Sequence, residues 1–222
     1  MHRFYSTVLC LLVALALPAS AGEFKVGGHG GYTAGGDIDD EDFAWGGQVL
    51  YEATENVALE FMASSYSDEA KETTSDGVGV TTELDVIALT LALIGSMEAS
   101  ETVNVYALGG LGYFLFDGDV GVDDTAAAAA LGTPGATFAS SFNFDPDDEF
   151  GVFVGAGVSV AVHEAVEIFA DYRYNFVEID ADISGSATAS APGVAPVTSS
   201  AAARIEGDFD HGVARVGVNF GF

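Results

Sequence analysis

Residues 211–222, HGVARVGVNFGF, show most clearly the pattern from which the fold is predicted. Every second residue in this stretch is small or apolar: Gly212, Ala214, Val216, Val218, Phe220 and Phe222. The residues between them are mostly polar or glycine, and Val213 is the apolar exception. Because successive side chains of a β-strand point to opposite faces, this spacing predicts a strand with one apolar face and one polar or small face.

The same alternation recurs along the chain after residue 22. Together with the last stretch it predicts eight strands, at about 23–33, 43–52, 57–64, 84–94, 103–116, 150–162, 171–176 and 211–222. Residues 84–94 and 103–116 read as strands, but their pattern does not show which side chains share a face. Strands of about ten residues match the length that crosses a bilayer when tilted.

The face opposite the aromatic residues carries glycine and isolated ionisable groups, which suits a narrow lumen better than a solvated surface. The apolar face carries no charge in six of the eight strands, as expected where it meets lipid. In lipid every backbone polar group must be paired within a closed sheet. The sequence therefore predicts an all-β fold, an eight-stranded antiparallel up-and-down transmembrane β-barrel. A soluble exported β-barrel is the alternative fold.

Connections alternate between long and short. The long ones are 35–42, 65–80, 117–149 and 181–207, and the short ones are 53–56, 95–102 and 163–165. All long connections therefore meet at one end of the barrel, and both termini lie at the other. The long connections hold most of the 34 acidic residues. Acidity is thus expected at one rim and hydrophobicity in the wall.

Composition excludes two classes of protein. The formal net charge is −28, with only 6 Lys and Arg, so a nucleic-acid partner is not expected. Hydrophobic residues make up 49% and the mean hydropathy is +0.32, which excludes disorder as the main state.

Residues 1–21 are predicted to be a cleaved signal peptide, with Arg3 before an apolar run and the small residues Ala19-Ser20-Ala21 at its end. The barrel domain is then residues 22–222. The single cysteine, Cys10, leaves with the leader, so neither a disulfide nor a cysteine-bound metal is expected.

The chain resembles the small eight-stranded outer-membrane barrels, a group that includes the membrane domain of outer-membrane protein A, the X-type barrels and the opacity-type surface proteins. The resemblance is carried by the ending VGVNFGF, by ADYRYNF with Asp171 and Arg173, and by YALGGLGYF and VFVGAGVSV. It implies the outer membrane of a Gram-negative bacterium, with lipid and lipopolysaccharide around the wall. It also implies that Val218, Phe220 and Phe222 form the signal read by the barrel assembly machinery.

The interior of an eight-stranded barrel is only wide enough to be filled by side chains. The ionisable residues expected there form an ion-pair network: Lys25, Glu52, Glu60, Glu167, Asp171, Arg173 and Arg215, with Asp85 as an addition. We interpret this network as a polar plug. The alternative is a small channel for ions or small solutes, which would need rings of like charge around open water.

Aromatic residues are expected in girdles where the wall meets water on either side. The candidates are Tyr32, Trp45, Tyr113, Tyr172, Tyr174 and Phe222.

No spaced catalytic motif is present, so a non-catalytic protein without a cofactor is predicted. Some small barrels modify lipids with a serine, a histidine and an acid. Of the histidines left after leader removal, His29 should face the lumen, His163 should lie on a short turn, and His211 should reach the acidic rim near Asp208 and Asp210. A lipid-modifying enzyme is the weaker alternative.

Two acidic clusters could bind a divalent cation through carboxylate oxygen. They comprise Asp37, Asp39 and Asp40 in one loop and Asp145, Asp147 and Asp148 in another. Neither has the spacing of an EF-hand loop, and a solvated acidic face that limits self-association is the simpler interpretation. No firm metal site is predicted.

The third and fourth long connections contain low-complexity runs of Ala, Ser, Thr and Gly, which are expected to be mobile loops without a packed core. In opacity-type relatives such loops form the adhesive surface. The expected role is therefore structural or surface-interactive, by a monomer that meets an extracellular ligand through these loops. The sequence names no ligand.

Overall fold

The computed structural model describes residues 22–36, 42–75 and 77–222, so the predicted leader lies outside the described residues. The described residues form ten strand segments of one antiparallel sheet and one short helix. The elements are β1 Glu23–Gly36, β2 Phe43–Thr54, β3 Val57–Thr73, β4 Gly79–Ser100, β5 Val103–Val122, α2 Asp124–Ala130, β6 Thr137–Pro146, β7 Glu149–His163, β8 Val166–Ser190, β9 Val197–Asp208 and β10 His211–Gly221. No helix in this part of the chain is long and apolar enough to span a membrane.

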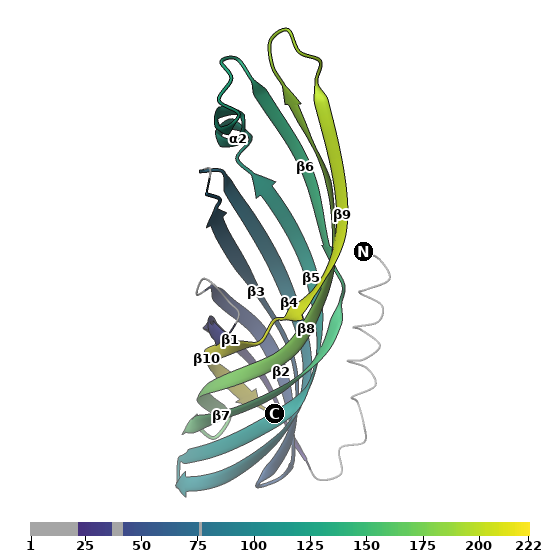
Figure 1. Cartoon of the computed structure of the whole chain (residues 1–222). Coiled ribbons are helices and arrows are strands. Elements are labelled where there is room, and N and C mark those ends of the chain that lie inside the picture. The colour runs from purple at the N-terminus through teal and green to yellow at the C-terminus, as the bar shows by residue number, and fades with distance from the viewer. Residues whose placement is uncertain (1–21, 37–41, 76) are drawn as a thin grey trace.

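The sheet closes on itself. β1 pairs with β2 on one side and with β10 on the other, and β10 pairs in turn with β8. β6 and β7 follow one another along the same edge of β8, and β9 and β10 follow one another along its opposite edge. Ten segments therefore fill eight positions around the ring (Figure 1). The predicted eight-stranded barrel is confirmed.

Six of the segments run beyond the ring at the end where the long connections meet. In Figure 1 β3, β4, β5, β6, β8 and β9 rise above the level at which β1, β2 and β10 end. We call this part the extension. It is open on the side of β1 and β2, because β9 pairs only with β8.

At the base of the extension the strands break, between β6 and β7 on one side of β8 and between β9 and β10 on the other. Between β6 and β7 the carboxylate of Asp148 accepts hydrogen bonds from the backbone N–H of Phe116, at 3.3 Å, and from the hydroxyl of Tyr113, at 3.2 Å. Between β9 and β10 the carboxylate of Asp210 accepts one from the N–H of Val177, at 3.1 Å. Aspartate side chains therefore satisfy backbone donors at both breaks.

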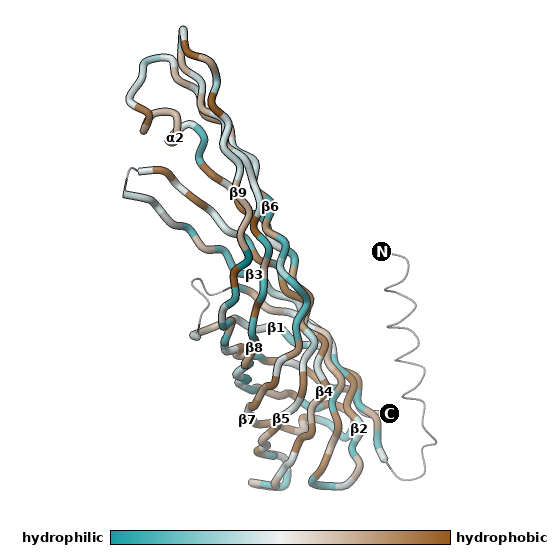
Figure 2. Tube along the Cα trace, turned by 45° about the vertical axis from the view of Figure 1, so that its right-hand side comes forward, coloured by the Kyte–Doolittle hydropathy of each residue, from teal (hydrophilic) through white to brown (hydrophobic). Residues whose placement is uncertain are grey.

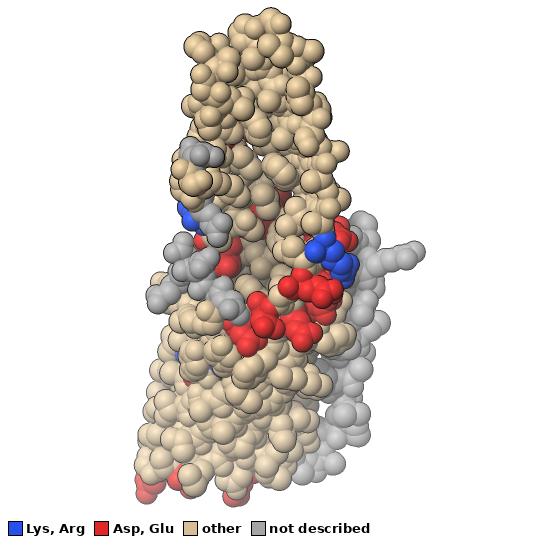
Figure 3. All heavy atoms as spheres, viewed as in Figure 1, with Lys and Arg blue, Asp and Glu red and all other residues tan. Residues whose placement is uncertain are grey.

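At this level the apolar and the polar residues change sides of the sheet. Apolar side chains lie on the outer face below it and on the inner face above it. Below it, Val154 and Leu93 on the outer face are 55% and 57% exposed, whereas Arg173 and Asp171 on the inner face are buried. Above it, Asp182 points outward and its neighbours Ala181 and Ile183 point inward. Figure 2 shows apolar residues concentrated on the lower strands, and Figure 3 shows a band of acidic residues across the middle of the molecule.

The strand phases that the sequence left open are now clear. In β4 and β5 the even-numbered side chains face the lumen, and many of them are apolar, including Val86, Ala88, Leu108 and Phe114. Both faces of these two strands are apolar, which is why their alternation was ambiguous. The expectation for Asp85 was wrong, since it is an exposed outer-face residue that accepts a hydrogen bond from the Ser67 hydroxyl at 2.6 Å.

The long connections also differ from the expectation of structureless loops. Residues 181–190 continue β8, residues 197–207 belong to β9 and pair with them, and residues 137–146 form β6. A β-ladder is held by backbone hydrogen bonds, which small side chains do not prevent. In the upper part of β8 and in β9, Ala, Ser and Thr on both faces give little hydrophobic alternation, so the sequence did not indicate strands there.

The hydrogen bonds of Asp148 generate a prediction about the break between β6 and β7. Asp148→Ala should lower the free energy of unfolding by about 1–2 kcal/mol, because the N–H of Phe116 loses its acceptor. Urea unfolding of the refolded barrel in detergent measures the change. Asp145→Ala, which alters an exposed residue of β6, is the matched control. Equal destabilisation by both variants would contradict the assigned role.

Candidate functional site

The ionisable residues of the lumen come from five strands whose inner faces meet. At the short-turn end Lys25 of β1 lies 2.6 Å from Glu52 of β2 and 3.3 Å from Glu167 of β8. Asn219 of β10 donates to Glu167 at 3.2 Å and accepts from Gln48 at 2.9 Å. This group bridges the lumen near the two chain ends of the ring.

A second, fully buried group lies at the middle of the barrel. Arg173 of β8 is 2.6 Å from Glu60 of β3, and Arg215 of β10 is 2.6 Å from Asp171 of β8. Asp171 also lies 3.4 Å from Arg173 and accepts a hydrogen bond from Tyr106 at 3.0 Å. All four charged side chains of this group are at most 3% exposed. All seven residues of the expected network therefore face the lumen, in two groups.

Glycines of β7 make room for the central group. A β-carbon at Gly157 would lie 2.5 Å from the Tyr106 ring and 2.6 Å from the β-carbon of Asp171. The guanidinium groups also rest on aromatic rings, Arg173 over Phe153 and Arg215 over Phe169, each 5.6 Å from the ring centroid. Gly157 of β7 therefore leaves room for the side chains of the central group.

Two positive and two negative charges compensate each other at the centre. Because buried charges are costly to desolvate, such an arrangement persists only when each charge is paired and hydrogen-bonded. The pairing crosses the lumen from β3 to β8 and β10, so it ties opposite walls together. It has the form of a plug rather than of a ring of like charge.

An apolar layer, which the sequence analysis missed, closes the lumen above the ion pairs. Phe114, Phe116 and Phe209 pack there with Tyr66 and Val213. His211 is fully buried among them, 2.6 Å from the Tyr66 hydroxyl and 3.1 Å from the Asn175 amide. Val213, which broke the alternation of the last strand, belongs to this layer. We call it the upper seal.

The seal depends on one glycine in β5 itself and on one in the neighbouring strand β7. A β-carbon at Gly112 would lie 2.5 Å from the Phe114 ring, and one at Gly151 would lie 2.9 Å from it. The ring therefore occupies space that two side chains would otherwise fill. Cavities left between the layers are small, about 80 Å³ beside Tyr106 and Asn219 and about 20 Å³ beside Met62 and Asn175.

The structure separates the acidic residues considered for a divalent cation. Asp147 lies 2.9 Å from Arg204, which also contacts Asp180 at 3.0 Å, and these hydrogen bonds raise the pKa of Arg204, with that to Asp180 contributing most. Asp148 bonds to Tyr113, and Asp145 is exposed. Asp37, Asp39 and Asp40 lie outside the described residues. Within the described ranges no group of three or more potential ligands is arranged to hold a metal ion.

The histidines differ in their surroundings. His29 is buried on the lumen side of β1, and His163 is exposed at the short turn after β7. His211 reaches the predicted end of the barrel, but its ring is buried in the upper seal and contacts Tyr66, Asn175 and the carbonyl of Phe209.

The expected girdle residues lie on the outer face. Tyr32 packs edge-on against Phe43, and Tyr113 packs against Phe150. Tyr174 packs against Phe176, and the hydroxyl of Tyr172 donates to the Ala34 carbonyl at 3.5 Å. Trp45 and Phe222 are 60% and 87% exposed, and Val218 and Phe220 share the outer face with Phe222.

Comparisons with known proteins agree with this architecture. The model of the outer membrane protein beta-barrel domain matches residues 7–222. Outer membrane protein OprG from Pseudomonas aeruginosa is 18% identical with a TM-score of 0.65, covering 91% of this chain and 96% of OprG. A major outer membrane protein from Thermus thermophilus is 13% identical with a TM-score of 0.52, covering 91% of this chain and 100% of that protein.

Neisserial surface protein A is 16% identical with a TM-score of 0.50, covering 90% of this chain and 97% of that protein. At these identities the likeness shows the fold alone. A search of curated proteins found no match.

The central ion pairs generate a prediction about stability. Asp171→Ala should lower the free energy of unfolding by about 3–5 kcal/mol, because it leaves Arg215 buried without its carboxylate partner. Heat-modifiable migration and urea unfolding in detergent measure the loss. Arg204→Ala removes an exposed arginine with three acidic partners and should change little. If the two variants were equally stable, the central group would contribute nothing to the barrel.

Proposed function

Because the chain belongs to the outer membrane protein beta-barrel domain family, we propose that it is a non-catalytic surface-interaction protein whose barrel is a closed anchor. Family membership implies an outer-membrane location. The short turns then face the periplasm and the extension faces the cell exterior, as in other barrels with long extracellular loops.

The observation that carries the proposal is that the outer face of the sheet changes from apolar to polar at the base of the extension, while the inner face becomes apolar. Below this level the outer face is apolar and suits lipid. Above it the outer face carries Asp182, Arg204 and Glu206, and the inner face carries Phe142 and Ile205, which are 37% and 46% exposed. A chain that only anchored itself would need no ordered sheet beyond the membrane. The extension instead presents a concave apolar surface to the exterior.

The filled lumen supports an anchor rather than a channel. The two ion-pair groups and the upper seal lie one above another, and the seal brings Phe114 and His211, both fully buried, into the lumen. Hydrophobic layers and compensated charges each oppose the passage of ions.

Three partners belong to the same proposal. Lipid, including lipopolysaccharide in the outer leaflet, surrounds the apolar wall. The barrel assembly machinery reads Val218, Phe220 and Phe222, all of which are on the accessible outer face of the last strand. A ligand outside the cell meets the extension, and the barrel acts as a monomer after removal of residues 1–21.

The contacts of His211 support a non-catalytic role. A triad histidine needs a nucleophile and an orienting acid within hydrogen-bond reach. His211 is instead held by a tyrosine, an asparagine and a backbone carbonyl in a buried apolar layer.

An adhesion assay tests the surface role. Cells of a Gram-negative host that lacks the protein would display either the full chain or a trimmed chain in which residues 119–143 and 181–205 are each replaced by an Asn-Gly turn, which joins the paired residues Gly118 with Phe144 and Asp180 with Glu206. Adhesion to cultured epithelial cells should rise with the full chain and return to the empty-vector level with the trimmed chain. Heat-modifiable migration shows that the trimmed barrel is folded. Equal adhesion by both chains would refute the role of the extension.

The closed lumen generates a separate prediction. The purified barrel in planar bilayers should show no steady conductance, because the upper seal and the ion pairs fill its interior. The double variant Phe114→Ala and Phe116→Ala, which empties part of the seal, should admit more current than the wild type. Stable open channels of uniform size in the wild-type protein would contradict the plug.

A further inference from the structure

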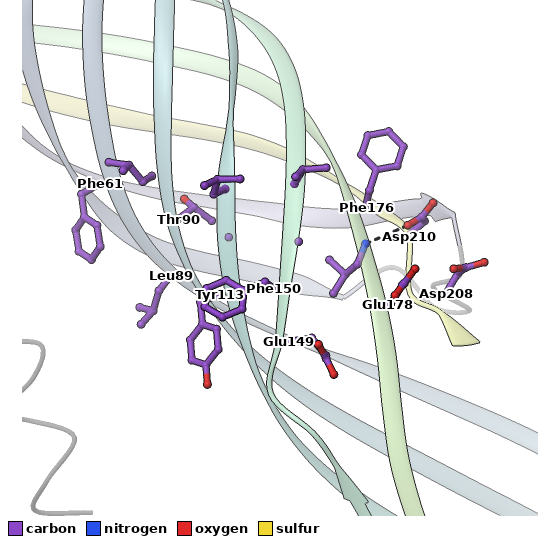
Figure 4. A pocket seen from close by; sticks show the side chains of 16 residues that line it. Phe61, Leu89, Thr90, Tyr113, Glu149, Phe150, Phe176, Glu178, Asp208 and Asp210 are labelled. Carbon is purple, nitrogen blue, oxygen red and sulfur yellow. Dashed lines mark hydrogen bonds between the residues drawn. The ribbon is translucent and has the colours of Figure 1, made fainter. Parts of the chain in front are cut away.

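A groove of about 950 Å³ crosses the outer face of the wall below the extension. Two rows of apolar side chains border it (Figure 4). One row contains Leu91, Leu111, Val152 and Phe176, and the other contains Leu89, Tyr113 and Phe150. Between the rows the lining passes through Thr90, Gly112, Gly151 and Val177, a row of paired residues that face the lumen, so that backbone forms the floor of the groove. The volume falls within the range of small-molecule sites.

The groove has a definite direction relative to the membrane. It begins at Phe61, close to the periplasmic start of β3, and reaches Asp210, at the extracellular end of β10. Paired residues on neighbouring strands form a row at right angles to the strands. Because the strands are tilted, the row from Phe61 to Phe176 rises from the hydrocarbon interior towards the outer surface of the membrane. One end of the groove therefore lies in lipid and the other meets water.

The two ends also differ in charge. The extracellular end is lined by Glu149, Glu178, Asp208 and Asp210, whereas the rest of the described lining is uncharged. None of the described lining residues is Lys or Arg. In Figure 4 Glu178, Asp208 and Asp210 lie together beside Phe176. The neighbouring acids Asp147, Asp180 and Asp182 surround Arg204.

We propose that this groove binds a single-chain amphiphile with a cationic head group, the chain lying between the apolar rows and the cation meeting Glu178 and Asp208. The chain packs against leucine, valine and aromatic side chains by van der Waals contact, which gains little over its contacts with the surrounding lipid, so the head group supplies most of the affinity. The carboxylates supply selectivity, because like charge repels the phosphate or sulfate head of an anionic lipid while a cation is attracted. The occupant is thus a cationic amphiphile rather than an ordinary phospholipid.

Spin-labelled lipids test the selectivity directly. The mature barrel would be placed in phosphatidylcholine nanodiscs with a nitroxide-labelled hexadecyl chain that carries a trimethylammonium, a phosphocholine or a sulfate head. Electron paramagnetic resonance then gives the fraction immobilised on the protein. At low ionic strength the ammonium probe should bind about tenfold more tightly than the sulfate probe. Equal binding of the three probes, or preference for the sulfate, would overturn the proposal.

Two variant pairs separate this site from the general acidity of the chain. Glu178→Gln with Asp208→Asn should abolish most of the preference for ammonium, whereas Glu83→Gln with Asp119→Asn, an equal change of charge at an exposed cross-strand pair outside the groove, should preserve it. Equal losses in both double variants would mean that only net charge attracts the probe, and would refute the site.

The second pair tests the groove itself. Leu111→Trp fills the space between the rows and should reduce immobilisation of the ammonium probe, while Val216→Trp, on the lipid-facing side of β10, should not. Unchanged binding in Leu111→Trp would also overturn the proposal. All variants keep the lumen intact, so folding can be checked independently by heat-modifiable migration.

Discussion

The need to pair every backbone polar group in lipid governs this molecule. A sheet meets that need only by closing, and closure occurs where β1 pairs with β10 and β10 with β8. Once the ring is closed, alternate side chains must face lipid and lumen along every strand. The apolar outer face, the crowded interior and the position of the charged residues all follow from this geometry.

Outside the membrane the constraint is relaxed, and the structure changes there. Strands no longer need partners on both sides, so β9 has only β8 and the extension is open. Water can satisfy free backbone groups, and the outer face becomes polar. The change from closed ring to open extension takes place over a few residues. There Asp148 and Asp210 accept hydrogen bonds from backbone N–H groups at the points where the strand segments break. An apolar inner face then remains accessible above the seal, which gives the proposed surface role a physical basis.

The sequence predicted the ring because lipid imposes a strict alternation on strands such as 150–162 and 211–222. It also led to the lumen residues Lys25, Glu60, Asp171, Arg173 and Arg215, since a charge that alternates with apolar lipid-facing residues falls on the inner face. It failed where both faces have the same character. Apolar residues on both faces of β4 and β5 hid the upper seal, and small residues on both faces of β8 and β9 hid the extension. The outer groove depends on which strands become neighbours, which no single segment records.

Strand β8 passes from the wall into the extension without a break, and along it the outer face changes from apolar to polar. Amide signals of the barrel in nanodiscs can be compared with a lipid-soluble and a water-soluble paramagnetic agent. The lipid-soluble agent should broaden the amide signals of the even-numbered residues from Ile168 to Phe176. The water-soluble agent should broaden those of the even-numbered residues from Glu178 to Ser186, on the same face of the strand. Lipid contact that continues through Ser186, or water contact at Ile168 and Tyr172, would contradict the account.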